Sequence, residues 1–141
     1  MKPRGHTKSH KAWNSRGGFT LIELLIVVVI IGILAAIAVP KFASTKEKAY
    51  LSKMKSDLRN LATAQESYMS TNFVYYGGAL PNATMTYNPS AGVTITIPAA
   101  SAAGWSALAT MPGLTAKSCA LYVGGVPPVA PATAEGQITC T

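Results

Sequence analysis

The most prominent pattern in the sequence is an uninterrupted apolar stretch over residues 19–39, FTLIELLIVVVIIGILAAIAV, in which Glu23 is the only charged residue. As a helix rising about 1.5 Å per residue, this stretch is roughly 32 Å long, close to a hydrocarbon thickness of about 30 Å. It is apolar on every side, so lipid or a fully buried bundle must surround it. It exceeds the apolar part of a secretory signal peptide, and no small-x-small cleavage pattern follows it. The pattern predicts a transmembrane helix over residues 19–40.

The pattern changes beyond the apolar stretch. Apolar side chains then recur at steps of three and four residues, which is typical of an amphipathic helix that packs one face on a core. The members of this stripe are Leu51, Met54, Leu58, Leu61, Gln65 and Tyr68, with Gln65 the one polar member. We expect the charged residues between them, Asp57 among them, on solvated faces, and Glu47 is available to a neighbouring molecule. This helix is expected over residues 41–76, with its end between residues 72 and 77.

Residues 77–141 are rich in Gly, Ala, Pro, Ser and Thr and contain short runs typical of strands. The clearest is VTITI at residues 93–97, where apolar and polar positions alternate. Weaker candidates are residues 85–87, 105–110, 120–123 and 137–140. Turn residues separate these runs, so we expect an antiparallel sheet of three to five short strands. The fold class is therefore predicted as α+β, with a long N-terminal helix, half transmembrane and half amphipathic, packed on a small antiparallel sheet.

The two cysteines, Cys119 and Cys140, both lie in the β-rich region. An even number of cysteines beyond a membrane span favours one disulfide formed outside the cytoplasm, and the alternative is two unrelated buried thiols. A bridge here closes a loop of about 22 residues and adds roughly 3 kcal/mol in the chain-entropy model. Residues 124–134, GGVPPVAPATA, are expected to form an exposed, semi-rigid loop inside it.

Positive charge is concentrated at the N-terminus. The formal net charge is +7, and residues 1–18 contribute five basic residues and no acid. The rest of the chain has seven basic residues against five acids, so no basic domain for nucleic-acid binding is indicated. Cations before a span favour a cytoplasmic N-terminus. Residues 1–18 are thus predicted to be a basic leader, and residues 41–141 to lie outside.

The residues needed for catalysis or metal binding are scarce. Both histidines lie within residues 1–18, and Glu135 is the only acid after Glu66. The β-rich region therefore lacks a carboxylate pair, a hard-cation cage and a zinc ligand set. We expect no enzyme, no cofactor and no metal. Asn82-Ala83-Thr84 matches the glycosylation sequon, a tripeptide that also occurs often by chance.

The junction of leader and span reads Arg16-Gly17-Gly18-Phe19-Thr20-Leu21-Ile22-Glu23. With the apolar run behind it, this motif resembles the type IV prepilin signal of the pilin and pseudopilin superfamily. The resemblance implies that a prepilin peptidase cuts between Gly18 and Phe19 and methylates the new amino group of Phe19. It also implies that Glu23 pairs with the α-amino group of a neighbouring subunit during assembly. An ammonium and a carboxylate that meet in lipid each offset the other's desolvation.

Gly32 and Pro40 are the expected helix-breaking positions. Pro40 lacks the amide that bonds to the carbonyl of Ala36 and disfavours helix at Val39, so a kink is expected there. In filaments of the family that the motif resembles, the stretch between the matching glycine and proline loses helical order. The resemblance implies that residues 32–40 extend when subunits pack.

The resemblance implies a structural subunit of a type IV pilus-like filament, polymerised through its hydrophobic helix. Its partners are then copies of itself, prepilin peptidase, the inner-membrane assembly machinery and, before assembly, membrane lipid. The precursor is expected in a bacterial inner membrane and the product in an extracellular filament. One alternative is a pseudopilin or minor pilin of a type II secretion-like system, although the scarcity of acids argues against its calcium-binding major branch. Another is an uncleaved single-span protein with a ligand-binding outer domain, which leaves Glu23 without a purpose.

Overall fold

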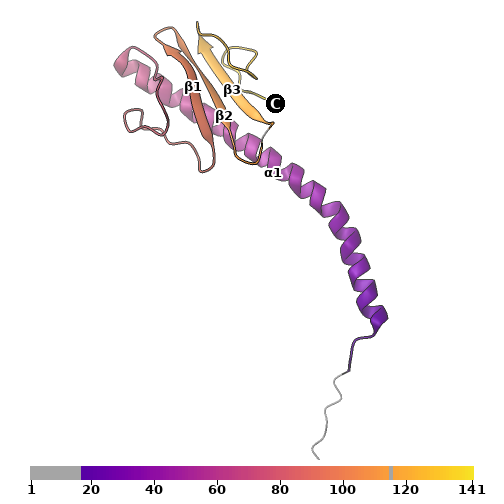
Figure 1. Ribbon diagram of the computed structural model, residues 1–141. Coiled ribbons are helices and arrows are strands. Elements are labelled where there is room, and N and C mark those ends of the chain that lie inside the picture. Colours follow the sequence, from indigo (N-terminus) through magenta and orange to yellow (C-terminus); the bar gives the residue numbers. More distant parts are fainter. Residues whose placement is uncertain (1–16, 115) are drawn as a thin grey trace, which may run out of the picture. The chain divides into compact units, whose positions relative to one another are not determined.

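A computed structural model of the chain describes residues 17–114 and 116–141, so the predicted leader lies almost wholly outside the described residues. In the described part, one helix is followed by four strands (Figure 1). The elements are α1 (Leu21–Asn72), β1 (Thr94–Ser101), β2 (Gly104–Thr110), β3 (Ser118–Gly124) and β4 (Thr139–Cys140). The α+β fold class is confirmed.

The chain divides into two compact units, Met1–Val39 and Pro40–Thr141. In the first, the described residues are a short non-helical stretch followed by the start of α1. The apolar side chains here are exposed, from Val27 at 50% to Phe19 at 87%. By its length and composition, α1 is able to cross a membrane. No residue of its most apolar part is buried. Such a surface requires an apolar environment from outside the chain.

The helix is not interrupted at Gly32 or Pro40, because α1 is continuous from Leu21 to Asn72 with Pro40 inside it. In the single chain the helix assignment thus runs through both positions, and the kink expected between residues 36 and 40 stays a prediction. A proline removes one amide donor, and the hydrogen bonds on either side of it continue the helix. The loss of helical order on packing into a filament stays a prediction.

The hydrophobic core of the second unit lies between α1 and the sheet. Met54, Leu58 and Leu61 of the predicted stripe are fully buried, which confirms the periodicity. They belong to one cluster with six residues of β1, β2 and β3, namely Ile95, Trp105, Ala107, Ala109, Cys119 and Leu121. Alanine at two alternate positions of β2 leaves room for the large side chains of the helix.

The sheet is antiparallel with strand order β1-β2-β3-β4. Its most regular pair is β2 with β3, in register from Gly104↔Gly124 to Thr110↔Ser118. The glycine pair at the end of this ladder is required, because a Cβ on Gly104 would collide with the carbonyl oxygen of Val123. The register of β1 shifts between Thr96 and Ala99, around Pro98, as expected of a proline in an edge strand.

One predicted strand extends well beyond its predicted end and another is absent, and the other strand limits differ from the prediction by one or two residues. β1 continues to Ser101, beyond the predicted end at residue 97, because the edge strand resumes pairing after its irregularity. Residues 85–87 form no strand, and the backbone there makes only an isolated bridge between Asn82 and Tyr87. Met85 and Tyr87 are nevertheless buried. Their apolar character reflects core packing and not sheet pairing.

The helix ends at Asn72, within the predicted window of residues 72–77. Phe73 has φ 57°, in the left-handed region, and its N–H donates to the carbonyl oxygen of Met69 at 2.9 Å. A left-handed residue just past the last turn is a common helix terminator. Here the non-glycine Phe73 takes that role, and not Gly77 and Gly78, the helix-breaking pair that follows in the sequence.

Asp57 is buried, which corrects the expectation that it lies on a solvated face. Its exposed fraction is 2%, and its carboxylate accepts hydrogen bonds from the N–H and hydroxyl of Ser90, at 3.1 and 2.8 Å. The hydroxyl of Tyr87 donates to the backbone carbonyl of Asp57 at 2.9 Å. Burial raises the pKa of Tyr87 above its ordinary value, and the negative charge of Asp57 raises this pKa further. These bonds attach the loop before β1 to the helix.

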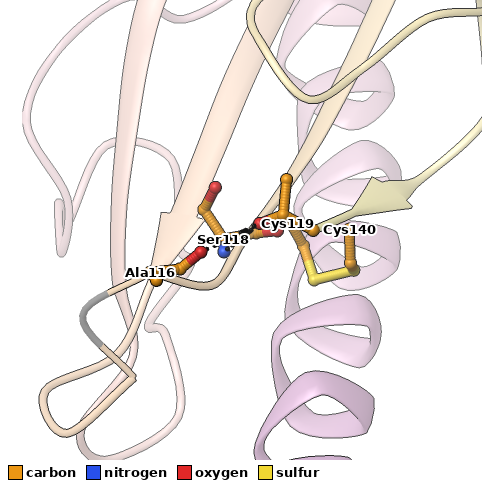
Figure 2. Close-up of a disulfide and its surroundings, with 5 residues drawn as sticks. Ala116, Ser118, Cys119 and Cys140 are labelled. Atoms are coloured by element: carbon orange, nitrogen blue, oxygen red, sulfur yellow. Dashed lines mark hydrogen bonds between the residues drawn. A yellow bond between two sulfur atoms is a disulfide. The ribbon is translucent and has the colours of Figure 1, made fainter.

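Cys119 and Cys140 form the predicted disulfide and face each other in the register of β3 and β4 (Figure 2). The loop inside the bridge is less exposed than predicted, because Ala132 is buried at 7% exposure. Two hydrogen bonds hold the C-terminal end of this loop to the end of β3. The N–H of Gly124 donates to the Glu135 carboxylate at 2.7 Å, and the N–H of Gly136 donates to the Tyr122 carbonyl at 2.9 Å.

Gln65, the polar member of the apolar stripe, is fully buried and holds the segment that follows the helix. Its side-chain N–H donates to the carbonyl oxygen of Tyr76 at 2.8 Å, and its side-chain oxygen accepts the N–H of Tyr76 at 2.8 Å. The side chain thus replaces a strand partner for one residue. Gln65 is polar because the backbone N–H and carbonyl groups of Tyr76 need hydrogen-bond partners at this place.

We predict that Gln65→Ala destabilises the outer unit by about 1–3 kcal/mol, because it removes the partner of two partly buried backbone groups of Tyr76. The measurement is thermal unfolding of the full chain in detergent, followed by the loss of sheet signal. Gln137→Ala is the matched control, because Gln137 is exposed. Equal melting temperatures for the two variants would contradict this role of Gln65.

Candidate functional site

The predicted cleavage point lies in an open stretch of chain. Residues 17–20 are neither helix nor strand, and all four are exposed. A Cβ added to Gly17 or Gly18 would have no atom within 4 Å, so both peptide units are accessible in the described structure. Phe19 follows with 87% exposure. A protease active site needs such an extended, unpaired segment, and this one ends where α1 begins.

Thr20 and Glu23 form a reciprocal cap on the first turn of α1. The N–H of Glu23 donates to the Thr20 hydroxyl oxygen at 3.3 Å. In return, the Glu23 carboxylate accepts the N–H of Thr20 at 2.8 Å and its hydroxyl at 2.7 Å. This arrangement is the capping box, with a Ser or Thr cap and a Glu three residues later. It explains why the helix begins at Leu21, directly after the cap.

The cap also sets the direction of the carboxylate. Both hydrogen bonds from Thr20 go to the oxygen Oε2, so Oε1 stays available to a further donor. Within residues 17–114 and 116–141, no Lys or Arg lies within ion-pair distance of Glu23. A negative charge in the first turn is also favoured by the helix dipole. The arrangement presents one carboxylate oxygen at the head of an exposed apolar helix.

The sequence reading assigned Glu23 to a contact between subunits and missed its partner within the chain. The signal was present, because Thr20-Leu21-Ile22-Glu23 before an apolar run is the T-x-x-E signature of a capping box. Thr20 is therefore an additional candidate site residue. The other predicted positions are separate from this site: Gly32 and Pro40 lie within α1, and Cys119 and Cys140 stabilise the sheet.

The described residues contain no second site with evident chemistry. Over residues 17–114 and 116–141, no group of three or more His, Cys, Asp or Glu is placed to hold a metal ion. Three acids of the outer unit have partners in the chain. Glu47 pairs with Lys117 at 3.2 Å, Glu66 accepts the Tyr75 hydroxyl at 3.0 Å, and Glu135 accepts the Gly124 N–H. Partial burial, and then this bond to Glu66, raise the pKa of Tyr75.

Comparison with known proteins points to the same N-terminal segment. Residues 13–39 match the family model described as the prokaryotic N-terminal methylation motif. The type IV major pilin protein PilA of Myxococcus xanthus is 57% identical over 53 residues, which are 38% of this chain and 24% of that protein. The type II secretion system core protein G of Pseudomonas aeruginosa is 45% identical over 60 residues, 43% of this chain and 42% of that protein.

The core protein G of Escherichia coli is 42% identical over 65 residues, 46% of this chain and 45% of that protein. The matches thus span a quarter of the pilin and less than half of the core proteins. Within that segment the class is clear: this chain has the prepilin methylation motif and N-terminal helix of the pilin and pseudopilin superfamily. The resemblance drawn from the residues around Gly18 and Phe19 is confirmed.

We predict that Thr20→Val loosens the first turn of α1, because valine keeps the shape of threonine and removes the capping hydroxyl. Amide hydrogen exchange of residues 21–24, measured on the full chain in detergent micelles, should become several-fold faster. Thr20→Ser keeps the hydroxyl and should exchange at nearly the original rate. Equally slow exchange in the valine variant would show that the cap does not hold this turn.

Proposed function

We propose that this chain is the precursor of a structural subunit of a type IV pilus-like filament. Prepilin peptidase removes residues 1–18, Phe19 becomes the N-methylated amino terminus, and the subunit polymerises through its hydrophobic helix. The observation that carries the proposal is the capped helix start, where Glu23 offers a free carboxylate oxygen at the head of an exposed apolar helix. The similar pilin and pseudopilin sequences cover this same segment.

The apolar helix supplies the surface on which subunits pack, but it contributes little to the preference for neighbouring subunits over lipid. Lipid tails are as apolar as the side chains of residues 24–39, so exchanging lipid for neighbouring helices yields little hydrophobic free energy. A charged pair behaves differently, because an ammonium and a carboxylate each lose hydration in the membrane and their mutual attraction offsets that cost only when they meet. Glu23 and the amino group of Phe19 on a neighbouring copy form such a pair. This contact fixes the position of each subunit relative to its neighbour in the filament.

The orientation of the chain in the membrane rests on the disulfide. Cations flank both sides of the apolar stretch, because six follow it within about 20 residues (Lys41, Lys46, Lys48, Lys53, Lys55 and Arg59). Once these cations are counted, the five before the stretch no longer support by themselves the cytoplasmic N-terminus predicted from the sequence. The Cys119–Cys140 bridge requires an oxidising compartment, which supports placing the outer unit outside the cytoplasm. The leader is then cytoplasmic.

A pseudopilin or minor pilin of a type II secretion-like system is the second candidate. It is favoured by the similarity to several core proteins G, at 42–45% identity over less than half of their length. Both candidates share the cleavage, the methylation and the assembly helix. They differ in where the product is found: a pilus carries its subunits to the cell surface, and a pseudopilus belongs to a secretion apparatus.

The deciding experiment is the intact mass of this protein in filaments sheared from cells. We expect the mass of residues 19–141 plus one methyl group and minus two hydrogens, which reports the cleavage, the methylation and the disulfide together. A processed species found only in membranes would favour the pseudopilin or minor pilin. An intact species that keeps residues 1–18 would contradict both and leave an uncleaved single-span protein.

We predict that Glu23→Gln leaves cleavage intact and lowers the yield of sheared filaments by about tenfold or more, because the charge that meets the amino terminus is lost. Glutamine keeps the length of the side chain and an oxygen that can accept from Thr20. Glu66→Gln is the matched control, since it makes the same change elsewhere on α1. A normal filament yield in the Glu23→Gln variant would overturn the charge-pairing account.

A further inference from the structure

Four cations follow one face of α1 beyond the apolar stretch. Lys41, Lys48, Lys55 and Arg59 are separated by seven, seven and four residues, which are near-whole numbers of helical turns. They therefore lie on the same side of the helix, along about 27 Å. Lys55 is half-buried and the other three are exposed. We refer to these four residues as the basic stripe.

No residue of the described part of the chain neutralises the positive charge of the basic stripe. Two acids lie between Lys41 and Arg59 in the sequence, and neither is on this face. Glu47 pairs with Lys117, and Asp57 is buried against Ser90. Among the described residues, no carboxylate lies within ion-pair distance of any member of the stripe. The stripe is therefore a continuous, uncompensated cationic surface.

The position of the stripe identifies its environment. Lys41 comes two residues after the apolar stretch ends at Val39, and next to it Phe42 is 75% exposed. A helix that carries lysines on one face and exposed Phe or Leu side chains beside them is typical of the boundary between lipid and water. Lys55 and Arg59 also line a groove of about 360 Å³ with Leu121, Gln137 and Ile138. Its apolar wall and two cations suit a phosphate attached to an organic group.

We propose that the basic stripe binds the phosphate groups of anionic phospholipids on the outer surface of the membrane that anchors the chain, before the subunit assembles. This inference rests on the proposed function, since it requires a membrane-anchored precursor. Electrostatic attraction to a lipid surface decays within a Debye length of about 8 Å. Only Lys41 and its neighbours reach the headgroups from an upright helix, so engagement of all four cations requires the outer helix to tilt toward the bilayer. Pro40 lies inside α1 and lacks the amide that would bond to Ala36, so the helix can bend at this point without being interrupted.

A second copy of the chain is a less suitable partner for this stripe. Glu47, Glu66 and Glu135 already have partners in their own chain, and Asp57 is buried. An identical copy therefore offers few free carboxylates to four cations. Phospholipid headgroups supply phosphates at high density immediately beside the stripe. Release from them on assembly would free the outer unit to enter a filament.

The experiment places a fluorophore on the stripe of the full chain, reconstituted as single copies in lipid nanodiscs. Ser52 is exposed and lies between Lys48 and Lys55 on the same face, so Ser52→Cys carries the label. The chain's two cysteines are joined in the disulfide, which leaves the new thiol as the one to be labelled. Thr96→Cys, on an exposed position of β1, is the control site. Quenching by a headgroup-attached quencher is compared in phosphatidylcholine discs with and without phosphatidylglycerol.

We expect quenching of the Ser52 label to be roughly twofold stronger with phosphatidylglycerol, to fall at high salt, and to be unchanged at Thr96. Lys48→Gln with Lys55→Gln should abolish the increase. Lys46→Gln with Lys53→Gln is the control, because it removes the same charge at the same spacing from another face and should preserve the increase. This variant also loses the hydrogen bond from Lys53 Nζ to the Ala91 carbonyl oxygen at 2.6 Å, so the two double variants are compared at equal melting temperature.

Three results would overturn the proposal. If quenching of the Ser52 label is the same with and without phosphatidylglycerol, the stripe does not bind anionic lipid. If both double variants lose the increase equally, the effect depends on the net charge of the chain and not on the stripe. If the Ser52 label is shielded from the quencher only in discs that hold several copies, whatever the lipid, the stripe binds a second copy of the chain and not lipid. A chain that does not enter the discs at all contradicts the membrane-anchored precursor itself, so this failure is distinguishable from failure of the stripe alone.

Discussion

The exposed apolar half of α1 places the strongest constraint on this protein. Most apolar side chains of residues 21–39 are at least 50% exposed. Contact of such a surface with water is strongly unfavourable. The chain must therefore exist in lipid or among helices from other molecules. Because both environments are apolar, the choice between them depends on polar groups. The Thr20–Glu23 cap lies at the start of this helix, and both hydrogen bonds from Thr20 go to one carboxylate oxygen of Glu23. Under the proposed function, the other oxygen favours neighbouring subunits over lipid.

The outer half of the same helix has the opposite requirement and meets it within the chain. Met54, Leu58 and Leu61 are covered by the sheet, and two buried polar side chains position the segments between helix and sheet. Asp57 holds Ser90 before β1, and Gln65 holds the backbone of Tyr76 after the helix. The disulfide then fastens the short β4 to β3. The outer unit is thus stabilised independently of whatever surrounds the apolar half.

Much of this organisation could be predicted from the sequence, and the reasons differ from element to element. The apolar run and the three-four stripe depend on spacing alone, so both were recognised. The strand at residues 93–97 was recognised from its alternation, but its continuation past Pro98 was not, because pairing on one edge tolerates a proline that a local pattern marks as an end. Residues 85–87 were mistaken for a strand since burial against α1 selects the same residue types as a sheet does.

The sequence by itself determined the prepilin motif, the transmembrane length of the helix and the pairing of two cysteines, because each follows from local order or from a count. Only the tertiary structure decided which polar residues are buried and what they hold. Asp57 and Lys55 look alike in a helical pattern as charged positions, yet Asp57 meets Ser90 and Lys55 stays in the basic stripe. Their difference depends on a loop more than 30 residues away in the chain. Contacts between distant segments are set by the packing of the whole unit, so they cannot be predicted from the local periodicity of the sequence.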